Sequence, residues 1–129
     1  MITMQRLRTA MACMALALCA RAGATEPFDA QVTVAAVTSS GMVFDVAYSI
    51  APQHYLYADT LALDLSPAAQ LTPLDVPAPQ RKFDPLTQED AALYSENFRA
   101  RYFVAHSADT PLAVTVRYQG CSSAELICY

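Results

Sequence analysis

Apolar and polar residues alternate with a period of two over several short stretches of the chain, which is the pattern of half-buried β-strands. The most regular stretch covers residues 42–50. Its apolar side chains that share one face are Phe44, Val46, Tyr48 and Ile50. Residues 28–37 alternate as well, and the sequence TSSG at residues 38–41 favours a turn between the two stretches. The two stretches are therefore predicted to form an antiparallel β-hairpin.

Further strands are predicted at residues 61–65, 98–105 and 112–118. Five prolines interrupt residues 66–85, which permits only short or edge strands there. Residues 87–92, with the sequence TQEDAA, fit either one helical turn capped by its first threonine or a polar loop. About seven short strands with turns between them predict an all-β fold, an immunoglobulin-like antiparallel β-sandwich.

The first 24 residues differ from the rest of the chain. They have a basic start, an apolar run over residues 10–20 and the small residues AGA at positions 22–24, a site that signal peptidase accepts. The apolar run is shorter than the ~20 residues that cross a bilayer as a helix. We therefore predict a cleavable signal peptide over residues 1–24 and an exported folded domain over residues 25–129.

Composition and charge support one small folded domain. The chain has 129 residues, of which 54% are apolar and 16% are charged. An apolar share this high can bury enough surface to offset the entropy cost of folding, which disfavours a disordered chain. The formal net charge of −4 argues against a nucleic-acid-binding surface. Removal of the predicted signal takes away three arginines and no acidic residue, which makes the exported domain more acidic still.

One pair of cysteines, Cys121 and Cys128, remains in the exported domain, because Cys13 and Cys19 lie in the predicted signal. A chain that turns through residues 122–125 and returns afterwards brings the pair within the roughly 4.4–6.8 Å Cα separation of a disulfide. A bridge that closes so short a loop adds at most about 2–3 kcal/mol of stability. On these residues alone two roles stay open: a structural bridge, the commoner role in exported domains, and a redox-active pair.

The histidines do not suggest a metal centre. His54 and His106 lie far from the cysteines in the sequence, so the cysteine pair lacks the ligands of a closed zinc site. Neither histidine accompanies a serine or cysteine signature of a hydrolytic enzyme. We predict no metal and no cofactor, and delivery of a metal through the thiols would need a further ligand.

The sequence YQGC at residues 118–121, followed by CY at residues 128–129, resembles the cysteine segment of the N-terminal domain of the DsbD family of thiol:disulfide interchange proteins. YLY at residues 55–57 resembles a Tyr-Leu-Tyr element of that family. LYS at residues 93–95 falls where the family has an aromatic-containing loop that caps the cysteines. The likeness extends over nearly the whole exported domain.

The resemblance implies a periplasmic domain of a protein-disulfide reductase that relays electrons by thiol–disulfide exchange. It implies a thioredoxin-like domain as electron donor, and disulfide isomerases or thioredoxin-like proteins of cytochrome c maturation as acceptors. By position, Cys128 resembles the family cysteine that bonds to partners and Cys121 the one that resolves the mixed disulfide. Whether this chain is an enzyme by itself is left open, and nothing after the signal is apolar enough to span a membrane.

The resemblance also implies an apolar shield and a nearby negative charge, which both disfavour the thiolate and protect the reduced pair. The candidates for the shield are Tyr55, Tyr57, Leu93 and Tyr94, and those for the charge are Glu89 and Asp90. Family members continue into a closing strand, so the sandwich is expected to lack its last strand. The alternative function is an exported immunoglobulin-like interaction module whose Cys121–Cys128 disulfide is purely structural.

Overall fold

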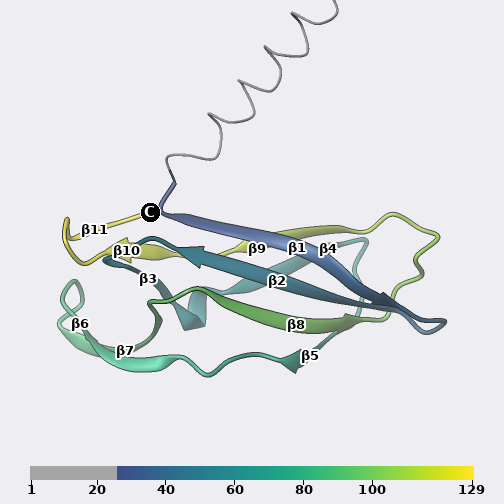
Figure 1. Ribbon diagram of the computed structural model, residues 1–129, viewed down its shortest axis with the longest axis horizontal. Helices are drawn as coiled ribbons and strands as arrows, with labels where there is room; N and C mark the ends of the chain where they lie inside the picture. Colours follow the sequence, from purple (N-terminus) through teal and green to yellow (C-terminus); the bar gives the residue numbers. More distant parts are fainter. Residues whose placement is uncertain (1–25) are drawn as a thin grey trace, which may run out of the picture.

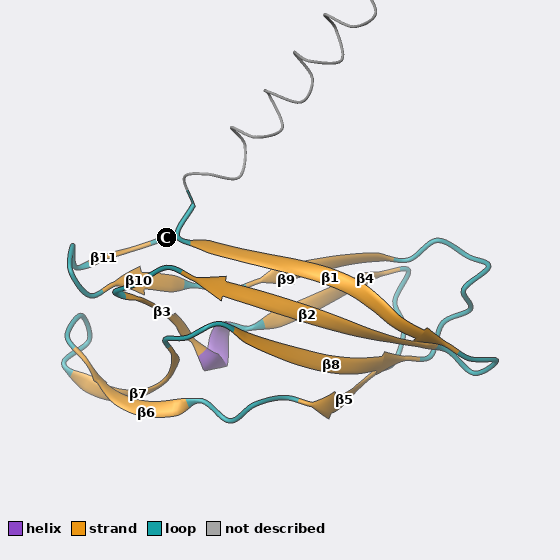
Figure 2. Ribbon diagram, in the orientation of Figure 1, coloured by secondary structure: helices purple, strands orange, loops and turns teal. Residues whose placement is uncertain are grey.

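The computed structural model describes residues 26–129, and the predicted signal peptide lies outside them. In this range the chain forms eleven strands and one short 3₁₀ helix. They are β1 (Phe28–Val37), β2 (Met42–Ile50), β3 (His54–Tyr57), η1 (Ala58–Thr60), β4 (Ala62–Ser66), β5 (Leu71–Asp75), β6 (Gln80–Asp84), β7 (Glu89–Tyr94), β8 (Phe98–Val104), β9 (Ala113–Arg117), β10 (Gly120–Ser122) and β11 (Ile127–Cys128). Strands therefore dominate the domain, as Figure 2 shows.

The strands pair antiparallel in three sheets, which confirms the predicted all-β class. The sheet orders are β1-β2-β8-β5, β11-β10-β3-β7-β6 and β4-β9. In Figure 1 the strands β1, β2 and β8 run along the long axis of the molecule, whereas β3, β6, β7, β10 and β11 gather at one end. The fold has more strands than the seven expected, because the short segments of this end each form a separate strand.

The core lies on the face of β2 that the alternation predicted. Phe44, Val46, Tyr48 and Ile50 are all buried there. From β8, Ala100 and Val104 join the same cluster, and partly buried side chains of β4 and β9 pack against it. The ring of Tyr48 stacks on Phe98 with centroids 4.5 Å apart. Because one face of each strand is buried, a slip of one residue would expose the whole apolar set, which fixes the register.

The predicted β1–β2 hairpin is present. Its turn is closed by a 2.8 Å hydrogen bond from the Thr38 N–H to the Gly41 carbonyl. The Thr38 hydroxyl also accepts the Gly41 N–H at 3.2 Å. Gly41 is required for close approach, because a Cβ there would lie 2.1 Å from the Val104 carbonyl oxygen. The turn therefore needs the polar residue at its start and the glycine at its end.

The proline-rich connection behaves as expected, since both strands that form in it are edge strands. β5 lies at one edge of its sheet and pairs only with β8, and β6 lies at the edge of the second sheet and pairs only with β7. β5 contains Pro73, which has no N–H to donate and is tolerated at an edge.

Residues 87–92 form neither of the two predicted structures. Residues 85–88 make a turn, and β7 begins at Glu89 and pairs with β6. The Asp84 carboxylate accepts the Leu86 N–H and the Thr87 hydroxyl, both at 3.0 Å, and Gln88 reverses the chain with a φ of 62°. Cross-strand pairing therefore overrides the weak local preference for a helical turn.

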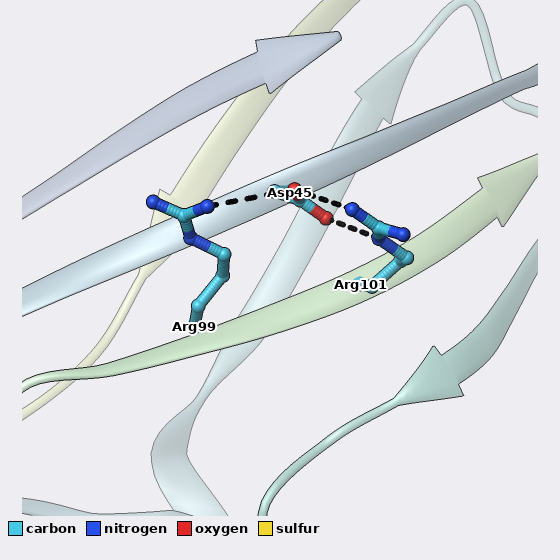
Figure 3. A network of polar contacts seen from close by, with 3 residues as sticks. All are labelled: Asp45, Arg99 and Arg101. Carbon is cyan, nitrogen blue, oxygen red and sulfur yellow. Dashed lines mark hydrogen bonds and ion pairs between the residues drawn. The ribbon is translucent and has the colours of Figure 1, made fainter. Parts of the chain in front are cut away.

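A polar cluster on β2 and β8 lies on the opposite face from the core (Figure 3). Asp45 and Arg101 are directly opposite in the register. The Arg101 guanidinium donates to the two carboxylate oxygens of Asp45 at 2.7 and 3.0 Å, and Arg99 lies 4.0 Å away. The hydrogen bonds from Arg101 hold the pKa of Asp45 below its ordinary value, although burial of the carboxylate opposes this shift. A nearly buried carboxylate is thus kept charged.

Candidate functional site

The two cysteines lie opposite each other in a short hairpin at one end of the molecule. β10 pairs with β11 so that Cys121 faces Cys128, and a disulfide joins them. Residues 123–126 form the turn, one residue later than predicted. The Cα atoms are 3.9 Å apart, closer than the separation expected from the sequence, because the two residues are directly paired across the hairpin.

The two ends of this disulfide differ in exposure. β10 lies between β11 and β3, whereas β11 is the edge strand of the sheet. Cys121 is completely buried, and Cys128 is an exposed residue. A molecule in solution can therefore approach the disulfide from the Cys128 side only.

A small apolar cluster surrounds Cys121. It consists of Cys121, Tyr55 and Leu93, and the partly buried residues Tyr57 and Leu86 pack against it. The register explains the arrangement, because Tyr55 is the cross-strand partner of Cys121, and Tyr57 is the partner of Leu93. Three of the four predicted shield residues thus come together at this cysteine.

Tyr94, the fourth predicted shield residue, lies elsewhere. Its ring stacks on Phe98 at 3.9 Å and belongs to the main core, and its hydroxyl donates to the Pro77 carbonyl at 2.6 Å. Neighbouring residues of a strand point to opposite faces, so Leu93 and Tyr94 do not both face Cys121. Two cluster residues were missing from the prediction: Leu86, which reaches the cluster from the β6–β7 turn, and Ala91 on β7.

The charged group in contact with the cluster is Asp84, not Glu89 or Asp90. Glu89 and Asp90 are exposed on β7, where they line an open hollow beside Tyr57. Asp84 is completely buried. Asp84 was not among the residues predicted from the sequence, although an aspartate followed by proline and, three positions on, threonine is a recognisable turn signal.

Four hydrogen-bond donors converge on the Asp84 carboxylate. The Tyr55 hydroxyl donates at 2.7 Å and the Tyr57 hydroxyl donates to the second oxygen. The Leu86 N–H and the Thr87 hydroxyl supply the other two bonds. The Tyr57 oxygen also lies 3.6 Å from the Sγ of Cys121. A continuous polar path therefore connects the buried sulfur to the buried carboxylate.

The hydrogen bonds fix the protonation states of this network. Burial opposes ionisation of Asp84, but the donated bonds from Tyr57, Tyr55, Leu86 and Thr87 together hold its pKa below the ordinary value of 3.8. Burial, followed by the bond to Asp84, raises the pKa of Tyr55 and of Tyr57. At neutral pH the network thus contains one carboxylate and the neutral hydroxyl donors of two tyrosines and one threonine.

The two histidines lie in other contacts. The Nδ1 of His54 lies 2.8 Å from the Pro52 carbonyl, and the Nε2 of His106 lies 2.9 Å from the Thr110 carbonyl. Within residues 26–129, the structure brings together no group of three or more histidine, cysteine or acidic side chains that fits a metal ion. Over the same range no helix is both long and apolar enough to cross a membrane.

Comparison with known proteins places these features in context. Residues 23–129 match the family described as "Thiol:disulfide interchange protein DsbD, N-terminal". The thiol:disulfide interchange protein DsbD of Ralstonia nicotianae is 32% identical over 97 residues, which are 73% of this chain and 15% of that protein. The crystal structure of the Neisseria meningitidis DsbD N-terminal domain in the reduced form superposes with a TM-score of 0.59 at 22% identity. The match covers 80% of this chain and 77% of that one, and it supports the immunoglobulin-like fold.

Proposed function

The chain belongs to the family of DsbD N-terminal domains, and from that premise we propose that it exchanges disulfides with other proteins through Cys121 and Cys128. Membership of the family supports a role in thiol–disulfide interchange. One observation carries the assignment to this pair: a buried cysteine is bonded to an exposed one at the edge of a sheet. Such a bond is open to attack at one sulfur and protected at the other.

In the first half of the proposed cycle, a thiolate of the electron donor attacks the Sγ of Cys128. A bond forms between the two proteins as the Cys121–Cys128 bond breaks, and the electron pair of the broken bond remains on Cys121, which takes up a proton. A second thiolate of the donor then attacks the donor's own sulfur in the mixed disulfide and releases Cys128 as a thiolate. The donor is oxidised by two electrons and the cysteine pair is reduced by two.

In the second half, the Cys128 thiolate attacks the disulfide of an oxidised acceptor protein. The first acceptor sulfur leaves as a thiolate and takes up the proton of Cys121. The Cys121 thiolate then attacks Cys128 in the mixed disulfide, which restores the internal bond and releases the acceptor in its reduced form. The difference in exposure supports these roles, because an exposed cysteine is open to another protein and the buried cysteine bonded to it is placed to resolve the intermediate. Cys128 is thus the partner-bonding cysteine and Cys121 the resolving one.

Asp84 and Tyr57 control the proton on Cys121 in this proposal. The Tyr57 hydroxyl donates its hydrogen bond to Asp84, so its oxygen is free to accept a hydrogen bond from the S–H group of reduced Cys121. The negative charge of Asp84 and the apolar walls formed by Tyr55, Leu93 and Leu86 both disfavour a thiolate. The reduced pair is thereby protected from indiscriminate oxidation. Asp84 takes the part for which Glu89 and Asp90 were the sequence candidates.

The proposed partners are a thioredoxin-like electron donor, and disulfide isomerases or cytochrome-maturation proteins of the periplasm as acceptors, after export by the signal peptide at residues 1–24. Family membership supports this proposal. The chain spans 15% of the Ralstonia nicotianae relative that it matches. The activity of such a whole protein is therefore part of the proposal.

Trapping of mixed disulfides tests the assignment. Cys121→Ser leaves the partner-bonding sulfur without its resolving thiol, so a covalent complex with a disulfide-bonded thioredoxin is expected to accumulate on non-reducing gels. Cys128→Ser is expected to give no complex, because the remaining sulfur is buried. The reverse pattern would refute the two roles.

Complete burial of Cys121 also favours the second candidate function, an interaction module with a structural bridge. A redox titration against glutathione and dithiothreitol separates the two. A structural disulfide has a reduction potential below about −300 mV, whereas a relay pair equilibrates with thioredoxin-like proteins near about −270 mV or above.

A further inference from the structure

Leu126, the last residue of the turn between the two cysteines, has an unusual backbone conformation. Its φ is 56°, in the left-handed region, where the Cβ of an L-residue approaches the following carbonyl oxygen. In the part of the chain that the structure describes, two other non-glycine residues have positive φ, Gln53 and Gln88. Leu126 is the apolar one of the three, and glycine or asparagine is the usual choice at such a position.

The contacts of the domain itself do not explain a leucine there. The turn is held by the Leu126 N–H, which donates to the Ser122 carbonyl at 3.0 Å, and by the Glu125 N–H, which donates to the Ser122 hydroxyl at 3.1 Å. Neither bond uses the leucine side chain. That side chain is 54% exposed, so its burial does not offset the backbone cost. Glycine at this position would form the same turn with less strain.

The exposed side chain of Leu126 lies at the end of the turn, two residues before Cys128. Ile127 and Tyr129, the direct neighbours of Cys128, are 46% and 54% exposed, but neighbours in an extended segment point to the opposite face, and the Tyr129 ring packs on Phe28 and His54. We call the end of the hairpin that carries Leu126 the apolar tip. A disulfide between two proteins holds the Cα atoms of its two cysteines within roughly 7 Å of each other. Any protein that bonds to Cys128 therefore lies next to the apolar tip.

We propose that Leu126 is a partner-contact residue, whose side chain packs against the apolar surface around the reactive cysteine of the protein that exchanges disulfides with Cys128. This inference rests on the proposed function. Its physical basis is that strained conformations persist where function requires them, and here an exposed apolar side chain is kept two residues from Cys128 at a backbone position that favours glycine. The occupant of the apolar tip is thus the rim of a protein with a redox-active cysteine, not a second copy of this chain.

The test compares a protein reductant with a small one on the full chain. Reduced thioredoxin is the protein probe, and its tryptophan fluorescence follows the reaction because this chain has no tryptophan. Dithiothreitol is the small reductant. Leu126→Gly and Leu126→Asn are the variants, and Leu74→Asn is the matched control, since Leu74 on β5 is 53% exposed and lies in the other sheet.

Both Leu126 variants are expected to react with thioredoxin about 5- to 20-fold more slowly, because an apolar anchor beside the new bond is lost. Their rates with dithiothreitol are expected to stay within about twofold of the parent. Leu126→Gly is also expected to raise Tm by about 2–6 °C, since it relieves the backbone. Leu74→Asn is expected to change neither rate. Slower exchange in a more stable protein is a combination that a merely structural role does not produce.

Three results would overturn the inference. Equal losses of rate with thioredoxin and dithiothreitol would mean that Leu126 acts through the conformation of the hairpin. Unchanged rates with thioredoxin would mean that the side chain makes no contact. Sedimentation of the parent as a dimer and of Leu126→Asn as a monomer would identify a second copy as the occupant. A parent chain that exchanges with neither reductant would refute the proposed function first, and the inference with it.

Discussion

Replacement of Asp84 by asparagine tests the buried network, because it preserves the shape of the side chain and removes its charge. The carboxylate of Asp84 accepts four hydrogen bonds, two at each oxygen. Asparagine keeps one acceptor oxygen and presents an N–H₂ group where the hydroxyls of Tyr57 and Thr87 now donate. Those two hydroxyls must rotate and become acceptors for the variant to fold.

The expected loss of stability in Asp84→Asn follows from the two hydrogen bonds that change from charged to neutral. Hydrogen bonds to a buried charged group contribute about 1.5–3 kcal/mol each, and a rotated neutral bond recovers about 1 kcal/mol of that. With two bonds affected, Asp84→Asn is expected to lower the free energy of unfolding by about 1–4 kcal/mol. For a domain of this size the corresponding loss in Tm is roughly 5–20 °C.

The loss of stability in Asp84→Asn is expected to depend on pH. Because the pKa of Asp84 is lowered on folding, the unfolded chain takes up the proton first as the pH falls. The stabilisation is therefore complete above the ordinary pKa of 3.8 and disappears as the pH falls through the lower pKa of the folded protein. The parent and Asp84→Asn are expected to differ most above about pH 4 and to converge below it.

Thermal unfolding followed by circular dichroism between about pH 2 and pH 7, with the disulfide intact, measures both effects. Asp90→Asn is the matched control, because it makes the same chemical change on an exposed residue of β7 and is expected to stay within about 0.5 kcal/mol of the parent. Parallel curves for the parent and Asp84→Asn over the whole range would show that the carboxylate is not held in its charged form, and the reasoning would fail.

Three further predictions concern the fold. Gly120→Ala is expected to lower the free energy of unfolding by more than about 2 kcal/mol, because a Cβ would lie 2.3 Å from the ring of the first residue of β1. A urea titration measures this, and a loss below about 0.5 kcal/mol would contradict the close packing. Val46→Ala is expected to lower the free energy of unfolding by about 2–3 kcal/mol, because its side chain is completely buried. Val34→Ala, on an exposed side chain, is expected to lower it by less than about 0.5 kcal/mol, and equal losses would be inconsistent with the assigned core. Arg101→Ala is expected to lower Tm at pH 7, where Asp45 is charged, but not at a pH low enough to protonate Asp45. The same loss of Tm at the two pH values would exclude the ion pair as the source of the stabilisation.

The hairpins show what local sequence is able to specify. The alternation over residues 42–50 identified the buried face of β2 correctly, because a strand has two faces and one of them must be apolar to reach the core. The same alternation in β1 was less informative, since Val32 and Val34 are exposed in the middle of a strand that lies at the edge of its sheet. A period of two therefore identifies a strand but not how much of it is covered.

The site was predicted in part. The pairing of Cys121 with Cys128 was accessible from spacing, because a short turn leaves few alternatives for two cysteines so close in the chain. Tyr55, Tyr57 and Leu93 were found by resemblance. Tyr94 was assigned to the wrong face, and Asp84, which interacts with residues 27 and 29 positions away, was not found.

By itself, the sequence determined the β1–β2 hairpin with its turn and the position of two cysteines in one short segment, because each of these depends on neighbours within a few residues. The tertiary structure alone decided that Cys128 is exposed while Cys121 is buried, and that Asp84 lies beneath two tyrosines. The physical reason is that burial and hydrogen bonding depend on the order and register of strands. Those are set when the whole apolar surface packs together, and no single segment contains that information.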